Sequence, residues 1–388
     1  MKLHFFTIVG SVLLFTHFYL WLRLVRDTRL SRRAAIVGTG IIICLALALP
    51  AARILARQLP LNQSLFLLWP AYLWLGMLFL YFAVFVCADS LKIIWHLLSC
   101  LLPAKSRQRP DPARRRFLGR AFAASASVLV WGGAAAGTVQ ALARPRVVRL
   151  RIKLDKLPAR FRGFKIVQLS DLHVGEMLRR EDLTGIVRTV NQLKPDLIAI
   201  TGDLVDGTVA QLANELAPLA GLRAGQGTFF VTGNHEYYSG VADWLPVIKE
   251  YGITVLDNRR VTLSRGDAKL ILAGVSDLWA GRFGSQYAPD FARALGSKPT
   301  AWPVILLAHQ PAALLQARRY TPPDLILAGH THGGQIWPFS LLVYLQQPYL
   351  KGLYQEGSTQ IYVNQGTGFW GPPMRLGTFN EITELILA

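Results

Sequence analysis

Two different patterns of apolar and polar positions divide the chain near residue 147. Before that point, long apolar runs alternate with short basic stretches. The runs at 3–22, 34–52 and 65–88 reach the roughly 20 residues that a helix needs to cross the hydrocarbon core of a bilayer. A fourth run, 121–143, is less apolar and rich in Ala, Gly and Ser. We therefore expect three transmembrane helices within 1–104, then a basic linker with a fourth over 105–146.

The apolar stretch from Ile93 to Leu102 is too short to span a membrane by itself. It is interpreted as an interfacial segment or as a continuation of the third helix. The pattern does not decide between these two.

The second half of the chain, 147–388, has the pattern of a mixed α/β domain. Val147, Leu150 and Ile152 open a short β-like segment. Apolar runs of strand length follow at 164–169, 197–200, 228–231, 304–308 and 325–328. Between the first two of these runs, Leu183, Ile186, Val187, Val190 and Leu193 recur at helical spacing. This arrangement predicts a βαβ unit whose strands are parallel and buried.

A polar motif follows each of these five apolar runs. The motifs are Asp171-Leu172-His173, Gly202-Asp203-Leu204-Val205-Asp206, Gly233-Asn234-His235-Glu236, His309 and Gly329-His330-Thr331-His332. Ligands bind at the carboxyl ends of strands in open α/β sheets. We therefore expect five loops at one sheet edge to bring carboxylates, an amide and up to five imidazoles together.

This set of side chains predicts a metal centre. The second half contains no cysteine, so thiolate sites are excluded there. Imidazole with carboxylate oxygen suits Mn, Fe, Zn or a mixed pair, and one carboxylate can bridge two ions about 3.5–4 Å apart. The short spacing in Asp171-Leu172-His173 lets both side chains reach one ion. Glycines before Asp203, Asn234 and His330 permit tight turns and close backbone approach.

The charge of the chain is concentrated in its first half. The net charge is +19, and residues 1–150 hold nineteen Lys and Arg against three Asp and Glu. A nucleic-acid-binding protein would carry this charge on its folded domain. Here the basic residues lie between apolar runs, as membrane topology requires, so no nucleic-acid partner is expected.

The basic flanks also predict an orientation. Basic residues cluster after the first and third apolar runs, whereas the loop after the second holds only Arg53 and Arg57. The positive-inside rule places the two basic loops in the cytoplasm. If 121–143 spans the membrane, the second half is extracytoplasmic, which is the expectation adopted here. If that run does not span, the second half is cytoplasmic.

Residues Arg114-Arg115-Arg116-Phe117-Leu118 have two interpretations. They resemble a twin-arginine export motif, and the following run ends in Ala141-Leu142-Ala143, which resembles a cleavage site. The alternative is an ordinary basic flank before a helix, because export signals normally lie at the N-terminus. The sequence does not distinguish between an export signal and a basic flank.

Taken in order, the five motifs resemble those of the calcineurin-like metallophosphoesterases over about 147–388. A further set of sequences resembles the bacterial, membrane-attached branch of that family. These are 329–335, Asn364-Gln365-Gly366, Arg375-Leu376-Gly377 and Glu381-Ile382. The resemblance implies an α/β fold, a β-sandwich flanked by helices, preceded by an N-terminal transmembrane helical region. It also implies a multi-pass protein of a bacterial inner membrane.

The resemblance assigns a role to each motif residue. Asp171, His173 and His332 would hold one divalent ion. Asn234, His309 and His330 would hold a second, and Asp203 would bridge the two. His235 would face the scissile phosphate, while Asp206 and Glu236 would orient the ligands. The implied activity is hydrolysis of phosphomonoester, phosphodiester or pyrophosphate bonds by a metal-bridging hydroxide, with His235 as the acid.

The substrate is less defined than the reaction. Anchoring in a bilayer favours a lipid-linked phosphate. The apolar and aromatic stretch 336–350, beside the last motif, either dips into the membrane interface or packs as strand and core. Trp279, Phe369 and Trp370 share this ambiguity. The sequence predicts no oligomeric state.

Two other functional classes would show sequence features that this chain does not have. A membrane sensor or scaffold with a degenerate phosphoesterase domain would have lost metal ligands, and none is missing here. A transporter or channel would carry ionisable residues inside its spans, and Asp27 and Asp89 fall only at their edges. Metal analysis together with hydrolysis of an aryl phosphodiester separates the enzyme from both.

Overall fold

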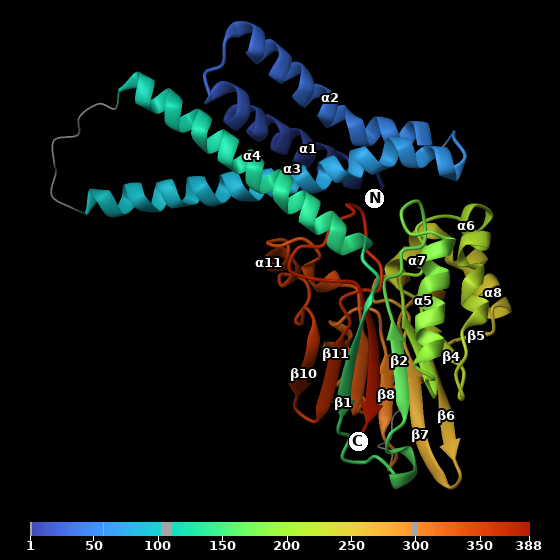
Figure 1. Cartoon of the computed structure of the whole chain (residues 1–388). Coiled ribbons are helices and arrows are strands. Elements are labelled where there is room, and N and C mark those ends of the chain that lie inside the picture. The colour runs from blue at the N-terminus through green and yellow to red at the C-terminus, as the bar shows by residue number, and fades with distance from the viewer. Residues whose placement is uncertain (1, 57, 102–110, 297–300) are drawn as a thin grey trace. The chain divides into compact units, whose positions relative to one another are not determined.

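The computed structural model describes residues 2–56, 58–101, 111–296 and 301–388 (Figure 1). The chain divides into two compact units. The first comprises Met1–Thr138 with Pro372–Met374, and the second comprises Val139–Gly371 with Arg375–Ala388.

Long apolar helices make up most of the first unit, and the last of them ends in the second unit. They are α1 (Lys2–Trp21), which continues as a π-helical turn over Leu22–Arg26, α2 (Arg32–Ala56), α3 (Leu61–Cys100) and α4 (Pro112–Leu142). Among the described residues, four helical segments are long and apolar enough to cross a membrane. The stretch after residue 89 continues α3 as one helix. Lys105, Arg107 and Arg109 of the predicted linker lie outside the described residues, and Arg114–Arg116 lie near the start of α4.

The outer surfaces of these helices are apolar. Ile8, Ile36 and Val128 are all more than 60% exposed, which is typical of helices that face hydrocarbon. Near the end of α1, Arg23 forms an ion pair with Asp27 at 2.7 Å, and Asp89 accepts a hydrogen bond from Tyr19 at 2.5 Å. Asp89, placed at the edge of a span by its position in the sequence, is therefore paired.

Two six-stranded sheets form the core of the second unit. The first has the order β1 (Arg146–Ile152), β12 (Glu381–Leu387), β2 (Lys165–Leu169), β3 (Leu197–Thr201), β4 (Thr228–Val231) and β5 (Ile253–Val255). The second has the order β10 (Gly352–Glu356), β11 (Thr359–Val363), β9 (Leu325–Ala328), β8 (Val304–Leu307), β7 (Ala268–Gly274) and β6 (Arg259–Arg265).

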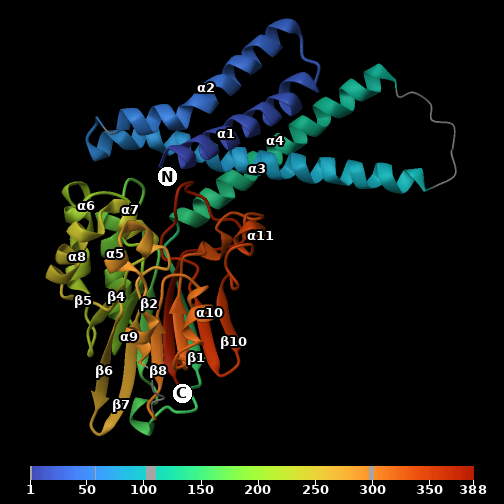
Figure 2. The same ribbon diagram turned by 180° about the vertical axis from the view of Figure 1, so that it is seen from behind.

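Helices flank this sandwich (Figures 1 and 2). They are α5 (Arg180–Gln192), α6 (Val209–Leu216), α7 (Asn234–Ser239), α8 (Val241–Glu250), α9 (Phe291–Leu295), α10 (Ala313–Ala317) and α11 (Ser340–Val343). One apolar cluster, which includes Ile166, Leu197, Leu272 and Leu307, joins strands of both sheets. A second cluster packs α9 and α10 against the outer face of the second sheet. The predicted fold class, a β-sandwich flanked by helices, is confirmed.

The pairing of strands explains how the motif loops meet. β2 pairs with β3 in parallel, as the βαβ pattern predicts. β2, β3 and β4 belong to the first sheet, whereas β8 and β9 belong to the second. The five motif loops therefore leave two facing sheets, and the expectation of one sheet edge was wrong. An antiparallel hairpin, β6–β7, carries the chain into the second sheet. α7 and α11 lie at the end of the sandwich opposite the C-terminus (Figure 2).

Candidate metal centre

The motif residues converge at the carboxyl ends of the strands. Three groups have ligand atoms within 4.8 Å of one another: Asp171 with His173 and His332, His173 with Asp203 and His235, and Asp203 with His309 and His330. The groups share His173 and Asp203, so they form one continuous cluster. All the aspartate and histidine ligands proposed from the sequence lie in it.

Asp203 occupies the middle of this cluster. One carboxylate oxygen, Oδ2, lies 3.1 Å from His309 Nε2 and 3.7 Å from His173 Nε2. The other, Oδ1, accepts a hydrogen bond from the backbone N–H of His235 at 2.9 Å. The carboxylate thus lies between the two sets of histidines, where a bridging ligand is required.

Glu236 holds the Asp203 loop in place through hydrogen bonds to its backbone. Its buried carboxylate accepts backbone hydrogen bonds from Asp203 at 3.0 Å and from Leu204 and Gly233 at 2.7 Å each. Burial, with the nearby charge of Asp203, raises the pKa of Glu236 to about 8. Glu236 therefore supports the backbone of the cluster, and its side chain is not a member of the three ligand groups.

The hydrogen bonds of the imidazoles indicate which nitrogens are available to a cation. His309 donates through Nδ1 to the carbonyl of Thr201 at 2.7 Å, and His173 Nδ1 lies 3.1 Å from Asp206 Oδ1. In a neutral imidazole the other nitrogen then carries the lone pair. His173 Nε2 lies 3.0 Å from His332 Nε2, and His309 Nε2 lies 3.1 Å from His330 Nδ1. These facing nitrogens suit coordination to cations.

The buried side-chain oxygen of Asn234 also indicates a cation site. Asn234 Oδ1 is buried and, among the described residues, has no hydrogen-bond partner. Leaving a buried acceptor unsatisfied costs about 1–3 kcal/mol. An oxygen ligand to a divalent cation would satisfy it, so the residues present fit a metal centre.

Burial and neighbouring charges shift the pKa values of the cluster in both directions. Burial lowers the pKa of His330 to about 3, so its imidazole is neutral, the form that binds metal. Burial by itself would raise the pKa of Asp203, but the charges of His309 and His235 hold it well below its usual range. Burial would likewise lower the pKa of His235, yet the charges of Asp203 and Asp206 raise it to about 9.

The backbone is strained at the ligand positions. Asp171, His173, Asp203, His330 and His332 all have positive φ, between 48° and 69°. Such a conformation costs a non-glycine residue of order 1–3 kcal/mol and persists where the surrounding fold imposes it. No sequence pattern predicted this. Strain at several neighbouring polar residues is a feature of functional sites.

Glycine is needed for close approach at two motif positions. Gly202 has φ +89°, a conformation that side chains disfavour. A Cβ on Gly329 would lie 1.9 Å from Ser170 Oγ and 2.4 Å from Asp171 Oδ2. The glycines noted in the sequence therefore allow the loops to come together.

The sequence comparisons agree with this geometry. The family model for the calcineurin-like phosphoesterase matches residues 164–334. An uncharacterized metallophosphoesterase of Helicobacter pylori is 41% identical over 277 residues, which cover 71% of this chain and 73% of that protein. A transmembrane protein with a metallophosphoesterase domain from Danio rerio is 34% identical over 399 residues, covering 100% of this chain and 89% of that protein.

The chain belongs to the calcineurin-like metallophosphoesterase family. An uncharacterized metallophosphoesterase of Campylobacter jejuni is also similar, with 33% identity over 95% of this chain and 94% of that protein. This membership makes the chain a metal-dependent phosphoric ester hydrolase, and the Asp and His cluster supplies candidate ligands for its divalent ions.

Arg375 is a functional candidate in this metallophosphoesterase that the sequence reasoning used only as part of a tail motif. Its side chain is fully buried, and burial lowers its pKa to about 9. It donates hydrogen bonds to the carbonyls of His332 at 3.2 Å, Gln365 at 2.8 Å and Gly368 at 2.5 Å. Arg375 thereby ties the His332 loop to the loop that follows β11.

Aromatic side chains form the rim of the site. The His235 ring lies 5.2 Å from the Tyr238 ring and 5.6 Å from the Trp370 ring, measured between centroids. Trp279 packs edge-on against His330 at 5.7 Å. Phe369 is buried, whereas Trp370 is half exposed.

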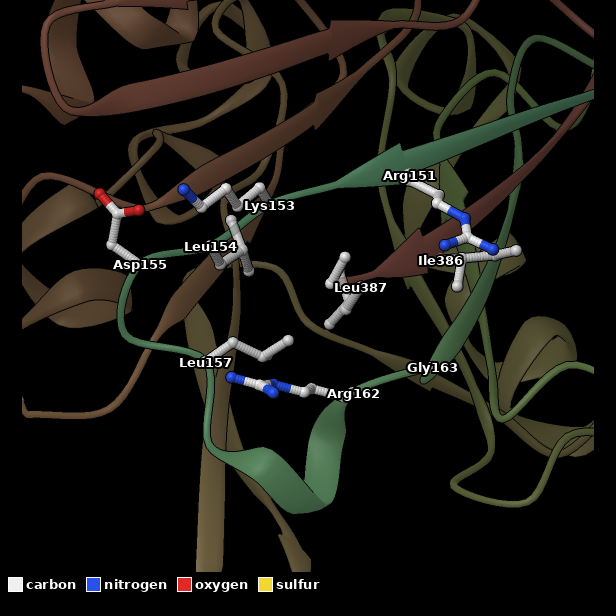
Figure 3. Close-up of a pocket in the computed structure, with 10 residues that line it drawn as sticks. Arg151, Lys153, Leu154, Asp155, Leu157, Arg162, Gly163, Ile386 and Leu387 are labelled. Atoms are coloured by element: carbon white, nitrogen blue, oxygen red, sulfur yellow. The ribbon is translucent and has the colours of Figure 1, made fainter.

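A cavity of about 600 Å³ lies away from this cluster, where β1 and β12 end. Arg151, Lys153, Arg162 and Leu387 are among the residues that line it (Figure 3). None of its lining residues belongs to the five motifs. The chemistry is therefore assigned to the metal centre and not to the cavity.

Proposed function

We propose that this protein is a membrane-anchored phosphoesterase that uses two divalent ions to hydrolyse phosphomonoester, phosphodiester or pyrophosphate bonds. The observation that carries the proposal is the position of Asp203, whose carboxylate lies between His309 on one side and His173 on the other. A shared carboxylate flanked by two imidazole groups is the arrangement that two neighbouring ions require.

The proposed ligands follow from the two sides of Asp203. Asp171, His173 and His332 would hold one ion, and Asn234, His309 and His330 the other, with Asp203 shared. The nitrogen and oxygen donors suit Mn, Fe or Zn. When bound, such ions supply Lewis acidity and a water of lowered pKa as the nucleophile.

His235 is proposed as the acid for the departing oxygen. Its Nδ1 lies 2.5 Å from Asp206 Oδ1, which leaves Nε2 as the nitrogen that faces substrate. The raised pKa, about 9, keeps the imidazole protonated at neutral pH. His235 also belongs to one candidate ligand group; in the proposed arrangement it faces the substrate and holds no metal ion. Asp206 orients both His235 and His173 by accepting from each Nδ1.

The apolar helices are proposed to be a multi-pass anchor in a bacterial inner membrane. Basic residues follow the first and third spans, which places those loops in the cytoplasm. With α4 as the fourth span, the catalytic unit is extracytoplasmic. Protease treatment of intact spheroplasts tests this, because a C-terminal tag that is digested only after lysis would contradict it.

The retained ligand set supports an enzyme over a sensor or scaffold. The test of the proposal is metal analysis of the purified full-length protein, together with hydrolysis of bis(p-nitrophenyl) phosphate in the presence of Mn, Fe or Zn. We expect bound metal and metal-dependent turnover. Protein that binds no transition metal and gains no turnover with any of the three would overturn the proposal.

A further inference from the structure

The chain enters the catalytic unit at the edge that carries the metal centre. Only Ala143–Pro145 separate the end of α4, Leu142, from the start of β1, Arg146. This connection spans at most about 14 Å. β1 pairs in parallel with β12, so Arg146 lies opposite Glu381, where β12 begins. β12 is antiparallel to β2, so this beginning adjoins the carboxyl end of β2, from which the Asp171 loop emerges.

Hydrogen bonds join the last turn of α4 to this edge. The Asn380 side-chain amide donates to the carbonyls of Ala141 at 2.6 Å and Ala143 at 3.1 Å. The next residue, Glu381, donates its backbone N–H to the carbonyl of Gly366 at 2.9 Å. The neighbouring Thr367 then donates to the carbonyl of Ser170, next to the ligand Asp171. A short run of contacts therefore connects the end of a helix of spanning length to the site.

The same edge carries exposed apolar side chains, here called the interfacial patch. The patch consists of Trp337, Leu341, Leu342, Leu345 and Trp370, whose exposed fractions range from 53% to 79%. Soluble monomers rarely expose apolar groups of this size side by side. Within the same stretch Ile336 and Leu350 are buried. The stretch 336–350 thus divides into residues that pack inward and residues that are exposed on the surface of the catalytic unit.

The interfacial patch borders the metal centre. Gln335, three residues after the ligand His332, donates to the carbonyl of Trp370 at 2.8 Å and accepts from its N–H at 3.0 Å. The Trp370 ring in turn packs against the His235 ring. α11, which carries three of the patch leucines on or beside it, lies at the same end of the sandwich as α7 (Figures 1 and 2).

We infer that the interfacial patch inserts into the headgroup region of the bilayer that holds the helices, and that the site takes a phosphate ester whose alcohol carries a hydrocarbon tail. Tryptophan and leucine beside the end of a spanning helix are the residues that favour this region of a membrane. The substrate class rests on the proposed function, whereas the insertion of the patch does not.

Insertion is tested without any measurement of turnover. In the full-length protein with Cys44, Cys87 and Cys100 replaced by serine, Leu345→Cys is labelled with an environment-sensitive fluorophore and placed in phosphatidylcholine nanodiscs. Trp302→Cys is the control, because Trp302 is also exposed but precedes β8, at the opposite end of the sandwich. We expect lipids with nitroxide-labelled acyl chains to quench the label at 345 and not at 302. Equal quenching at both positions would overturn the inference.

Substrate preference is tested with two chromogenic diesters. One is soluble bis(p-nitrophenyl) phosphate, and the other is p-nitrophenyl hexadecyl phosphate embedded in phosphatidylcholine vesicles. We expect Trp337→Ser to lower the ratio of embedded to soluble turnover about tenfold, as expected when a large apolar contact is lost, and Trp302→Ser to leave the ratio unchanged. A ratio in Trp337→Ser equal to wild type would refute the substrate class. Absent turnover of both diesters by wild type, together with absent bound metal, would instead refute the proposed function.

Discussion

Replacing Asp206 by asparagine removes one negative charge from the centre while preserving the shape of the side chain. Asp206 Oδ1 lies 2.5 Å from His235 Nδ1 and 3.1 Å from His173 Nδ1. This carboxylate oxygen therefore contacts both the proposed acid and a proposed metal ligand. The substitution weakens both contacts and leaves the proposed metal-binding atoms in place.

The expected magnitude follows from the charged hydrogen bond to His235. A hydrogen bond to a charged group contributes about 1.5–3 kcal/mol, and one pKa unit corresponds to about 1.36 kcal/mol. The pKa of His235, about 9 in the wild type, is thus expected to fall to about 7–8. Because the protonated form is the active acid, activity is retained below this pKa and lost above it. The basic limb of the rate profile therefore moves to lower pH.

The assay is kcat for an alkyl aryl phosphodiester between pH 6 and 10 with saturating metal, together with metal content by mass spectrometry. Loss of the His173 contact should weaken metal binding about 10–100-fold, which saturating metal offsets. Asp155→Asn is the matched control, since Asp155 lies in the cavity at the far end of the unit. A variant that keeps its metals and its wild-type basic limb would show that Asp206 does not set the protonation of His235.

Four further outcomes are expected. Asp203→Ala should lose both bound metal, by mass spectrometry, and turnover, because the shared ligand is gone. His235→Ala should keep the metals and lose about 10²–10⁴-fold in turnover of a diester with a poor leaving group; wild-type activity there would refute its role. Gly329→Ala should lower metal content and the melting temperature, since its Cβ would lie 1.9 Å from Ser170 Oγ. Burial raises the pKa of Asp257 to about 6, so its stabilising contribution is complete below about pH 4 and lost as pH rises through 6. Asp257→Asn should therefore flatten the denaturant stability of the full chain between pH 4 and 7.

The positions of the motif loops were predictable because each apolar run ends directly at a polar motif. β4 and β9 have the bounds that the sequence predicted, and β8 differs by one residue. The assignment of these strands to two sheets was not predictable from local pattern. Parallel strands that are buried on both faces have similar apolar sequences, whichever of the two sheets they belong to. Only their pairing, which brings β9 beside β11 and β2 beside β12, separates the two sheets.

The role of Arg375 was not predictable for a related reason. Its partners are backbone carbonyls, and a carbonyl carries no signal in the sequence. His332 lies 43 positions away from Arg375, and the contact exists only because β9 and β11 are neighbours. The sequence likewise gives no sign of the left-handed backbone at Asp171 and His332, because the surrounding fold imposes that conformation. Motif residues indicate the candidate ligands, whereas the contacts that hold them in place appear only with the structure.

The register of three strands determines where the site lies relative to the end of α4. If α4 spans the membrane, as proposed, a strand that starts three residues after it must begin near the membrane. Had β1 paired antiparallel with β12, its beginning would lie at the far end of the sandwich, with the cavity that Arg151 and Lys153 line. The observed parallel pairing of Arg146 with Glu381 instead brings the chain in beside the Asp171 loop. The topology of the sheet thus places the site at the end of the sandwich where the chain enters from α4, which supports the inferred lipid substrate.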